Sequence, residues 1–473
     1  MLLMFSSVVF ANEFGLKDFR MHLSSKTSMT DEMIGTFGGD MFERMSKAVP
    51  GDKQWDIVET SFLAPNGMTV FNTSFTSPSF DLMTGEAHFT FNPLFHVPFP
   101  KGNYAIIDNK FRILEGNGTE DISLAETYNH HWLIGTKTSI DPLEYCEGST
   151  FWGAGAEMRG MKYKVPEGYG IVRFNASGTC GANLHFIRTE DLAVSWDGFN
   201  DPKGNHGAAV KNCIECGYAP GRSIECLKIL DGDFACCFSG SRCPVNNPDD
   251  RSTKSYRLQY NISWTREVTS VKPLQGVVLD VSGGAIEWNV APNLNNKDIN
   301  QTCTDKVCTI TKDWTVGHQK GFGTGICAGR MLWSYTHQHT GAINATFFVN
   351  GSPKCTSKPI VGTDPTNKPG NEKGYVIKFT SCIDRDELKN DFVLHKGDQV
   401  SVQVLYDVDV NSTRNLPFPG GKHGGVMGLF FAMMDCDAGT FGERYTCYDH
   451  KCFPIIEGGG EFATKADCTA SCK

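Results

Sequence analysis

The sequence lacks the features by which nucleic-acid-binding and membrane-spanning proteins are usually recognised. It has no run of five or more basic residues, and its formal net charge is −9 at pH 7. A protein that binds by neutralising phosphates is therefore disfavoured, and we expect no nucleic-acid partner. Beyond residue 11, no apolar run approaches the ~20 residues of a membrane-spanning helix, so we expect no membrane span.

Signatures of several large enzyme classes are also missing. The sequence has no G-x-S-x-G turn, no Walker A loop, no H-E-x-x-H pair and no G-x-G-x-x-G after a predicted strand. These absences disfavour α/β-hydrolases, P-loop nucleotide hydrolases, zinc proteases of that type and dinucleotide-binding enzymes. No internal repeat of roughly 20–50 residues is present, which argues against a solenoid or a propeller.

Cysteines and glycosylation sequons are, by contrast, abundant. The 18 cysteines are too many for a reducing compartment unless they bind metal or do redox work. Residues 1–11 are mostly apolar and end in Val9-Phe10-Ala11, which predicts a short signal peptide without the usual positive start. We therefore expect a secreted, extracellular or cell-surface glycoprotein. The candidate glycosylation sites are Asn72, Asn117, Asn175, Asn261, Asn300, Asn344, Asn350 and Asn411.

Short alternating segments separated by Gly, Pro, Asn and Asp run from about residue 55 to residue 435. This pattern predicts a mostly β protein with two jelly-roll or β-sandwich domains. A boundary is expected near residues 268–276, and the last 33 residues hold four cysteines in a unit too small to bury a core. The predicted units are a signal peptide (1–11), an N-terminal extension (12–54), two β domains (55–270 and 271–440) and a Cys-rich module (441–473).

Histidines and one methionine form the candidate metal site. His337 and His339 make an H-x-H, and residues two apart on a strand point to the same face. His130 and His131 are adjacent, so both reach one ion only at a bulge, a strand end or a loop. Each pair alone is easily matched by chance among 13 histidines, and a polar strand face is the simpler interpretation of either.

Two further side chains extend this set. His185 alone is more often structural, and Met427 alone more often packs in a core strand. A thioether is nevertheless a soft ligand, and two imidazoles with a thioether favour copper, especially Cu(I). Met433, Met434 and His423 are alternative ligands close to Met427 in the sequence.

The order of these residues resembles the copper type II, ascorbate-dependent monooxygenases. The resemblance implies that His130, His131 and His185 hold one copper ion and that His337, His339 and Met427 hold a second, with ascorbate as the reductant. It also implies that the two ligand sets lie on separate domains facing a cleft, so that the sets need not be in contact. Activity would be C–H hydroxylation with O₂, in which His337, His339 and Met427 carry the catalytic role.

The flanking motifs are similar to a closer relative, the plant stress up-regulated nodulin family. The resemblance covers roughly residues 95–435. Its motifs are Phe99-Pro-Lys-Gly-Asn-Tyr-Ala-Ile106, Glu126-Thr-Tyr-Asn-His-His-Trp132, Cys213-Ile-Glu-Cys216 with Cys236, Cys237 and Cys243, His337-Gln-His-Thr-Gly341, Gly370-Asn-Glu-Lys-Gly-Tyr375 and His423-Gly-Gly-Val-Met-Gly-Leu-Phe430.

Two positions depart from the peptide-amidating members of the superfamily. Tyr335 stands where those enzymes have an arginine before the H-x-H, and Phe431 stands where they have a tyrosine after the methionine. Both changes remove polar anchors for a peptide C-terminus, so peptidylglycine is a poor substrate guess. Glu126 and Tyr128 precede the His-His pair, and each is either a support for it or an ordinary solvated strand residue.

The cysteines are expected to form disulfides. Cys213, Cys216, Cys226, Cys236, Cys237 and Cys243 match a zinc site in spacing, but secretory features favour a disulfide knot. Cys327 and Cys436 flank the second ligand set and are predicted to pair. Cys355 is expected to pair with Cys382, and Cys447, Cys452, Cys468 and Cys472 among themselves.

The sequence leaves functions of different classes open. The first is a secreted copper-dependent monooxygenase acting on an unknown small molecule, peptide or glycan. The alternative is a non-catalytic extracellular structural or adhesive glycoprotein with this fold, which self-assembles or binds extracellular-matrix partners. A wall or glycan-binding role for residues 441–473 is a third possibility, based on composition alone.

Overall fold

The computed structural model describes most of the chain from residue 55 onward. It describes residues 55–90, 96–134, 152–156, 163–176, 178–190, 252–283, 288–317, 325–389, 392–412, 423–436, 444–448, 450–455, 462 and 465–472. The predicted signal peptide, the N-terminal extension and the cysteine group at residues 213–243 lie outside these residues. Within them, no helix is long and apolar enough to cross a membrane.

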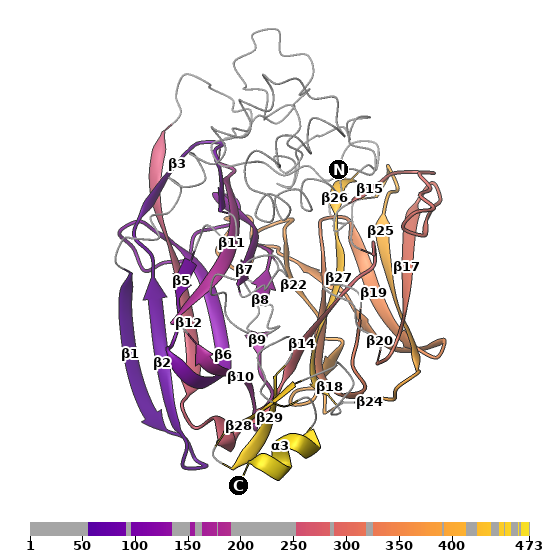
Figure 1. The fold of residues 1–473 in the computed structure, drawn as a ribbon. Coiled ribbons are helices and arrows are strands. Elements are labelled where there is room, and N and C mark those ends of the chain that lie inside the picture. The colour runs from indigo at the N-terminus through magenta and orange to yellow at the C-terminus, as the bar shows by residue number, and fades with distance from the viewer. Residues whose placement is uncertain are drawn as a thin grey trace, which may run out of the picture.

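The described strands up to residue 273 form two sheets, which we call the first block (Figure 1). The larger sheet runs β1 (Asp56–Leu63), β2 (Thr69–Thr76), β12 (Thr253–Thr265), β6 (Gly102–Glu115), β10 (Tyr169–Ala176) and β13 (Lys272–Pro273), with β3 (Phe80–Met83) on β12 and β9 (Tyr163–Lys164) on β6. The smaller sheet runs β4 (Ala87–Thr90), β11 (Thr179–Arg188), β7 (Thr127–Ile134) and β8 (Trp152–Ala154), with β5 (His96–Pro98) on β11.

Residues 275–436 form the second block, again with two main sheets. One runs β14 (Gln275–Asp280), β27 (Gly428–Cys436), β18 (Gly329–Gln338) and β23 (Ile383–Asp384), with β24 (Phe392–Leu394) on β18. The other runs β16 (Gln301–Cys303), β17 (Val307–Thr315), β25 (Gln399–Asp407), β19 (Ala342–Val349) and β20 (Ser352–Ser357). Two strand pairs complete it: β15 (Trp288–Val290) with β26 (His423–Val426), and β21 (Pro359–Val361) with β22 (Val376–Phe379).

The C-terminal residues form a small separate unit. Strands β28 (Arg444–Tyr448) and β29 (Lys451–Ile455) make a hairpin beside helix α3 (Lys465–Ser471). Two disulfides, Cys447–Cys472 and Cys452–Cys468, join the hairpin to the helix. Buried cysteines and Phe462 are its main apolar contacts, so covalent links replace the core that so few residues cannot build.

Alternating side chains explain why the larger first-block sheet has a polar and an apolar face. Along β12, Tyr256, Leu258, Tyr260, Ile262 and Trp264 are buried, while the residues between them are less buried. These five side chains pack with residues of β2, β6, β7 and β11 in one cluster, which we call the first core. A period of two is the pattern expected for a strand with one buried face.

The first core also contains side chains from the second block. On β27, Leu429, Phe431 and Met433 belong to the first core, whereas Phe430, Ala432 and Met434 belong to the core of the second block. The sheet that contains β27 and β18 is therefore buried on both faces. A strand covered on both faces is apolar throughout, as in Gly428-Leu-Phe-Phe-Ala-Met-Met434. The two blocks consequently share one packed interface.

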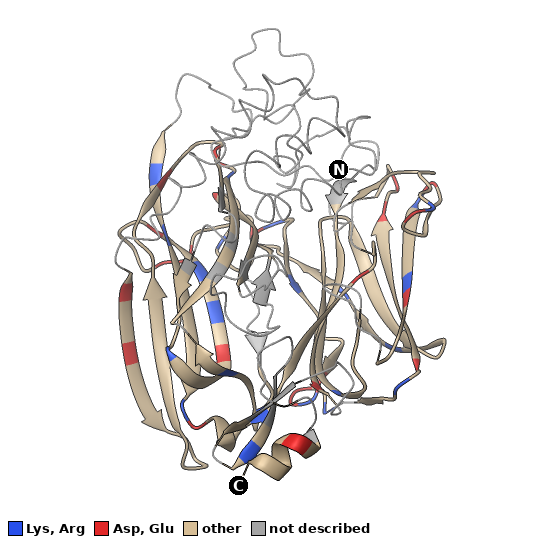
Figure 2. Ribbon diagram, viewed as in Figure 1, with Lys and Arg blue, Asp and Glu red and all other residues tan. Residues whose placement is uncertain are grey.

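Charged residues lie mainly away from the interface between the two blocks. Figure 2 shows almost no charge along β7, β11 and β27, where the two blocks face each other, and more on strands of the other two large sheets, such as β1, β6 and β17. Burying an unpaired charge between the blocks would cost several kcal/mol. The expectation of a mostly β fold is thus confirmed for the described residues.

Three disulfides lie in the second block. Cys327–Cys436 joins the segment before β18 to the end of β27, and Cys355–Cys382 joins β20 to the segment before β23. Both are the expected pairings. Cys303–Cys308, which closes the turn between β16 and β17, is a pairing that the sequence analysis did not anticipate.

Candidate metal centre

A β-bulge brings the adjacent histidines to the same site. His131 pairs with His185 across β7 and β11, and Asn129 pairs with Phe186. His130 has no partner in this register, so it is the extra residue of the bulge. Neighbouring residues on a regular strand point to opposite faces, and the bulge allows His130 and His131 to point to the same site. It is one of the three arrangements that the sequence allowed for a shared ion.

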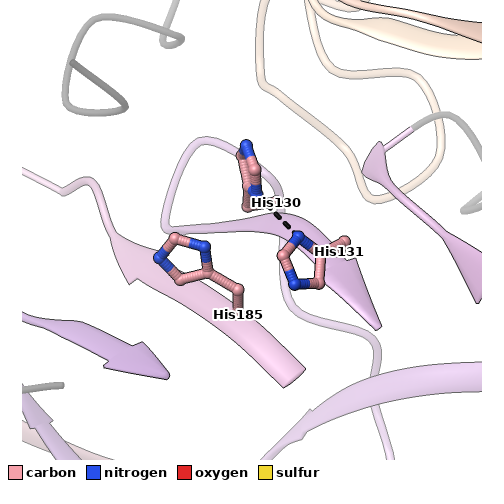
Figure 3. A group of neighbouring side chains, drawn as sticks. All are labelled: His130, His131 and His185. Carbon is pink, nitrogen blue, oxygen red and sulfur yellow. Dashed lines mark hydrogen bonds between the residues drawn. The ribbon is translucent and has the colours of Figure 1, made fainter. Parts of the chain in front are cut away.

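The three imidazoles of the first block converge (Figure 3). One nitrogen from each of His130, His131 and His185 lies within 4.8 Å of the others. The Nδ1 atoms of His130 and His131 are 2.9 Å apart and share a hydrogen bond. The ring centroid of His185 lies 4.8 Å from that of His130 and 5.4 Å from that of His131. Three nitrogen donors at this spacing suit a transition-metal ion.

The second ligand set lies at the end of β18. The ring centroids of His337 and His339 are 5.1 Å apart. His337 pairs with Leu429 and Gln338 pairs with Gly428, so the same register places His339 opposite Met427. Residues paired across strands and residues two apart along one strand share a face. The pleat therefore directs His337, His339 and Met427 to the same side, toward the first block.

Tyr406 on β25 fixes the backbone of this second set. Its hydroxyl donates to the carbonyl oxygen of Met427 at 2.6 Å and accepts from the amide of His339 at 2.9 Å. Met427 itself lies in the break between β26 and β27, not within a continuous strand. Next to it, a side chain on Gly428 would come within 2.6 Å of Val281, so only glycine allows this close approach. These contacts hold Met427 beside His339.

The two ligand sets meet. The ring of His130 lies 5.6 Å from the ring of His339, in an edge-to-face arrangement. The resemblance implied two sets that need not be in contact, and packing of β27 and β18 onto the first core brings His130 and His339 together. The five imidazoles thus form one cluster between the blocks, which we call the histidine cluster: His130, His131, His185, His337 and His339.

Burial keeps His130 neutral. Desolvation lowers the pKa of His130 well below its ordinary value, and repulsion by His185, His131, His339 and His337 lowers it further. His130 and His185 are 2% and 0% exposed, and His337 and His339 are also buried. A neutral imidazole has the lone pair that a metal ion requires, so the environment favours the ligand form over the proton-bound form.

The comparisons with known proteins identify the family. A model of the family described as stress up-regulated Nod 19 matches residues 143–435. The chain belongs to the stress up-regulated Nod 19 family. The matched residues include His185, His337, His339 and Met427, whereas His130 and His131 precede them.

Other comparisons add little to the Nod 19 assignment. No curated protein matches the chain. Among solved structures, one titled "Cucumber Leaf Spot Virus" has 8% identity and a TM-score of 0.17, covering 80% of this chain and 91% of that chain. One titled "Crystal structure of infectious bursal disease virus VP2 subviral particle" has 8% identity and a TM-score of 0.12, covering 90% and 89%. Similarity this low supports no conclusion about the fold.

Several neighbours of the histidine cluster have other partners. The Glu126 carboxylate accepts from the Tyr256 hydroxyl at 3.1 Å and pairs with Lys254 at 3.3 Å. Tyr128 lies 6.5 Å from His130 and 6.1 Å from Tyr375, measured between rings. Glu126 is thus tied to β12, while Tyr128 packs between the cluster and the second block.

The alternative ligands lie elsewhere in the fold. Met433 belongs to the first core and lies four residues along β27 from Leu429, on the side away from Met427. Met434 belongs to the second-block core, where its sulfur is 3.6 Å from Cys327 Sγ. The backbone of His423 pairs with Val290, and its side chain lies outside the described residues.

The two positions that depart from the amidating enzymes contact each other. Tyr335 and Phe431 are paired across β18 and β27, and their rings stack at 5.0 Å with an angle of 12°. Both rings are buried in the first core. Aromatic packing therefore occupies both positions at which the sequence was compared with the amidating enzymes.

Sequence reasoning missed one buried acid at the block interface. Glu372 is 0% exposed, and its two carboxylate oxygens accept from the amides of Leu124 and Gly370, each at 3.0 Å. Leu124 lies in the segment that leads into β7 and its histidines. The motif Gly370-Asn-Glu-Lys-Gly-Tyr375 is visible in the sequence, but a hydrogen bond to a residue 248 positions away has no local signature.

Proposed function

We propose that this chain is a secreted copper-binding protein of the copper type II, ascorbate-dependent monooxygenase type. The observation that carries the proposal is the histidine cluster, in which imidazoles from both blocks meet with Met427 at the next register position. The donor types fit copper, because imidazole binds both copper oxidation states and a thioether favours Cu(I). Each block has two main sheets, and this arrangement supports the proposed jelly-roll architecture.

The residues would divide into two ligand sets. His130, His131 and His185 would hold one copper ion, and His337, His339 and Met427 a second. When bound, copper with an ascorbate-type reductant supplies the one-electron and O₂ chemistry for C–H hydroxylation. The protein contributes orientation through the bulge and Tyr406, and burial lowers the pKa of His130 and keeps that imidazole neutral. Secretion is supported by the disulfides.

The substrate is expected to be neither a peptide carboxylate nor another strong anion near Tyr335. The stacked Tyr335 and Phe431 offer no cation at the positions that anchor a peptide C-terminus in the amidating relatives. A neutral or apolar C–H-bearing compound fits these residues better, because the two packed aromatic side chains offer no charge to pair with an anion.

Substitution of His337 tests the proposal. In His337→Ala, ascorbate-dependent O₂ consumption should be lost and bound copper should fall, because one imidazole of the second set is removed. Oxygen consumption is measured with an electrode, and copper by elemental analysis of the purified protein. His395→Ala, at an exposed histidine, is the matched control and should retain both. Parental oxygen consumption in the His337 variant would refute the assignment.

A second function has its own support. The contact between the two ligand sets and the burial of His130 and His185 suit a metal ion that joins the blocks without turnover. The chain would then be an extracellular structural or adhesive glycoprotein. Copper bound to the native protein without ascorbate-dependent O₂ consumption would favour this alternative, and tight copper binding with O₂ consumption would favour the enzyme.

A further inference from the structure

A groove of about 360 Å³ lies on the outer face of the larger first-block sheet. It crosses β1, β2, β12 and β6, which lie side by side in Figure 1. Register defines its floor as two rows. One row is Thr60, Asn72, Ser263 and Asp108, and the other is Val58, Ser74, Asn261 and Lys110. All but Val58 offer a hydroxyl, a carboxamide or a charged group.

Two glycosylation sequons interlock on this floor. Asn72-Thr73-Ser74 lies on β2 and Asn261-Ile262-Ser263 lies on β12. Antiparallel pairing places Asn72 opposite Ser263, and Ser74 opposite Asn261. The Ser263 hydroxyl donates to Asn72 Oδ1 at 2.7 Å. Each sequon asparagine therefore lies across from the hydroxyl residue of the other sequon, and both face the same groove.

The size of the groove limits what it holds. Pockets that bind small ligands range over about 300–1,000 Å³, so this groove is near the smallest. Asparagines at diagonal positions on neighbouring strands are about 7–8 Å apart. Two N-linked sugars starting at Asn72 and Asn261 would compete for the same volume, whereas one would be seated between the polar side chains of the floor.

We propose that this groove is the seat of one N-linked glycan, carried by Asn72, and that its presence excludes a glycan on Asn261. This inference rests on the secretory route proposed above but not on copper. Asn72 is the more exposed of the two asparagines. It also leaves the ribosome about 190 residues earlier, so it meets the glycosylating enzyme first.

The chemistry of the modification balances with one co-reactant. The carboxamide nitrogen of Asn72 bonds to C1 of an N-acetylglucosamine, and the C1–O bond to a lipid pyrophosphate donor breaks. The lipid pyrophosphate leaves with the electron pair of that bond, the nitrogen gives up one proton that neutralises one negative charge of the released pyrophosphate, and nothing is oxidised or reduced. After folding, Thr60, Asp108 and Lys110 are placed to hydrogen-bond with the hydroxyls of the first sugar.

An attached glycan fits the groove better than a free saccharide. No aromatic side chain lines it, so the groove lacks the apolar surface on which free ligands usually depend. A covalent link supplies a high effective concentration, so that weak hydrogen bonds suffice.

Site occupancy measured by mass spectrometry tests the proposal, using the full chain secreted from eukaryotic cells. Asn72 should be modified and Asn261 unmodified. Ser74→Ala removes the first sequon without changing Asn72, and modification should move to Asn261. Ser263→Ala removes the second sequon and should leave the occupancy of Asn72 unchanged. Asn117, in an exposed turn, is the internal control for glycosylation.

Each other outcome overturns the proposal. Glycans at Asn72 and Asn261 on the same molecule would contradict exclusion, as would an unmodified Asn261 in Ser74→Ala. If Asn117 carries a glycan while Asn72 and Asn261 do not, the groove does not hold a glycan but the secretory route still stands. If no site carries a glycan, the secretory route is refuted as well. Chitobiose titrated into the Ser74→Ala, Ser263→Ala double variant should not bind, and shifts in groove signals by NMR would identify a free-saccharide site instead.

Discussion

Single residues decide whether the candidate metal centre can work, and Met427 is the clearest case. Met427 is buried, shares the interface face with Leu429 and Phe431, and has its carbonyl held by Tyr406. The same burial suits either a ligand or a core methionine, and only chemistry separates the two roles. A substitution that keeps its volume and removes the sulfur is therefore informative.

Met427→Leu should weaken Cu(I) binding while leaving the fold stable. The swap conserves volume, so the free energy of unfolding should fall by less than about 1.5 kcal/mol. Cu(I) affinity is measured by competition with a chromogenic chelator, and stability by chemical denaturation. Met433→Leu, on the same strand face, is the control and should leave Cu(I) affinity unchanged. Equal affinities in both variants would show that Met427 is only a packing residue.

A second single-residue effect concerns pH and lies outside the histidine cluster. His88 on β4 is buried and stacks on Phe80 at 4.6 Å, and burial lowers its pKa from 6.5 to about 4. The unfolded chain therefore takes up the proton first as the pH falls. Stability from neutral His88 is complete above pH 6.5 and is lost progressively down to about pH 4.

The His88 contribution amounts to about 3 kcal/mol across that pH range. His88→Phe keeps an aromatic ring in the stack and removes the titrating group, so its unfolding free energy should vary less between pH 6.5 and pH 4. Denaturant titrations at several pH values measure the difference. His450→Ala, at an exposed histidine, should retain the parental pH dependence. An unaltered slope in His88→Phe would show that another group controls acid stability.

At the scale of elements, the position of β7 relative to β18 determines the histidine cluster. The segment leading into β7 is held from the second block by Glu372 and by the contact of Tyr128 with Tyr375. On the second-block side, close approach to the Glu372 carbonyl leaves no space for a side chain at Gly362. The loop around residues 362–375 thus holds the two blocks together through Glu372 and Tyr375, and we call it the clamp.

Loss of the Glu372 carboxylate should loosen the clamp. Glu372→Ala leaves the buried amide of Leu124 without an acceptor, at about 1–3 kcal/mol, and also removes the acceptor of the half-buried Gly370 amide. Denaturation measures the loss, and hydrogen exchange at the Leu124 amide should accelerate. Lys373→Ala, at the adjacent exposed residue, should change neither. Unchanged exchange at Leu124 in the Glu372 variant would exclude the clamp.

At the scale of the whole molecule, the shared first core makes the two blocks energetically dependent. Residues such as Tyr260 from the first block and Phe431 from the second lie in one cluster, and the histidine cluster crosses the same interface. A ligand that binds only the folded state stabilises everything that must be assembled to form its site. Bound copper should therefore raise the unfolding free energy of both blocks together.

Copper at about one hundred times its dissociation constant should add about 2.7 kcal/mol to the stability of the joined blocks. Calorimetry with and without copper should show one main transition that moves to higher temperature and returns when a chelator is added. His185→Ala, which removes a ligand from the first block alone, should reduce the shift for the whole transition. Two separate transitions, of which only one responds to copper, would refute the coupling.

Local sequence patterns determined much of this protein. Alternation of apolar and polar residues predicted the mostly β fold, as in β12 and β25, because the period of a strand is visible within a few residues. Spacing around the H-x-H and the late apolar strand predicted the Cys327–Cys436 pairing that the structure contains. The types and order of the candidate ligands were likewise readable from the chain.

Tertiary structure alone decided how those ligands are arranged. The bulge at His130, the approach of His130 to His339, and the hydrogen bond from Leu124 to Glu372 join residues far apart or out of register. No local sequence period encodes these contacts, because they depend on how the sheets of the first block pack against the sheet that contains β27 and β18. Adjacent histidines were ambiguous in the sequence for the same reason: the strand that pairs with them determines which way each ring points.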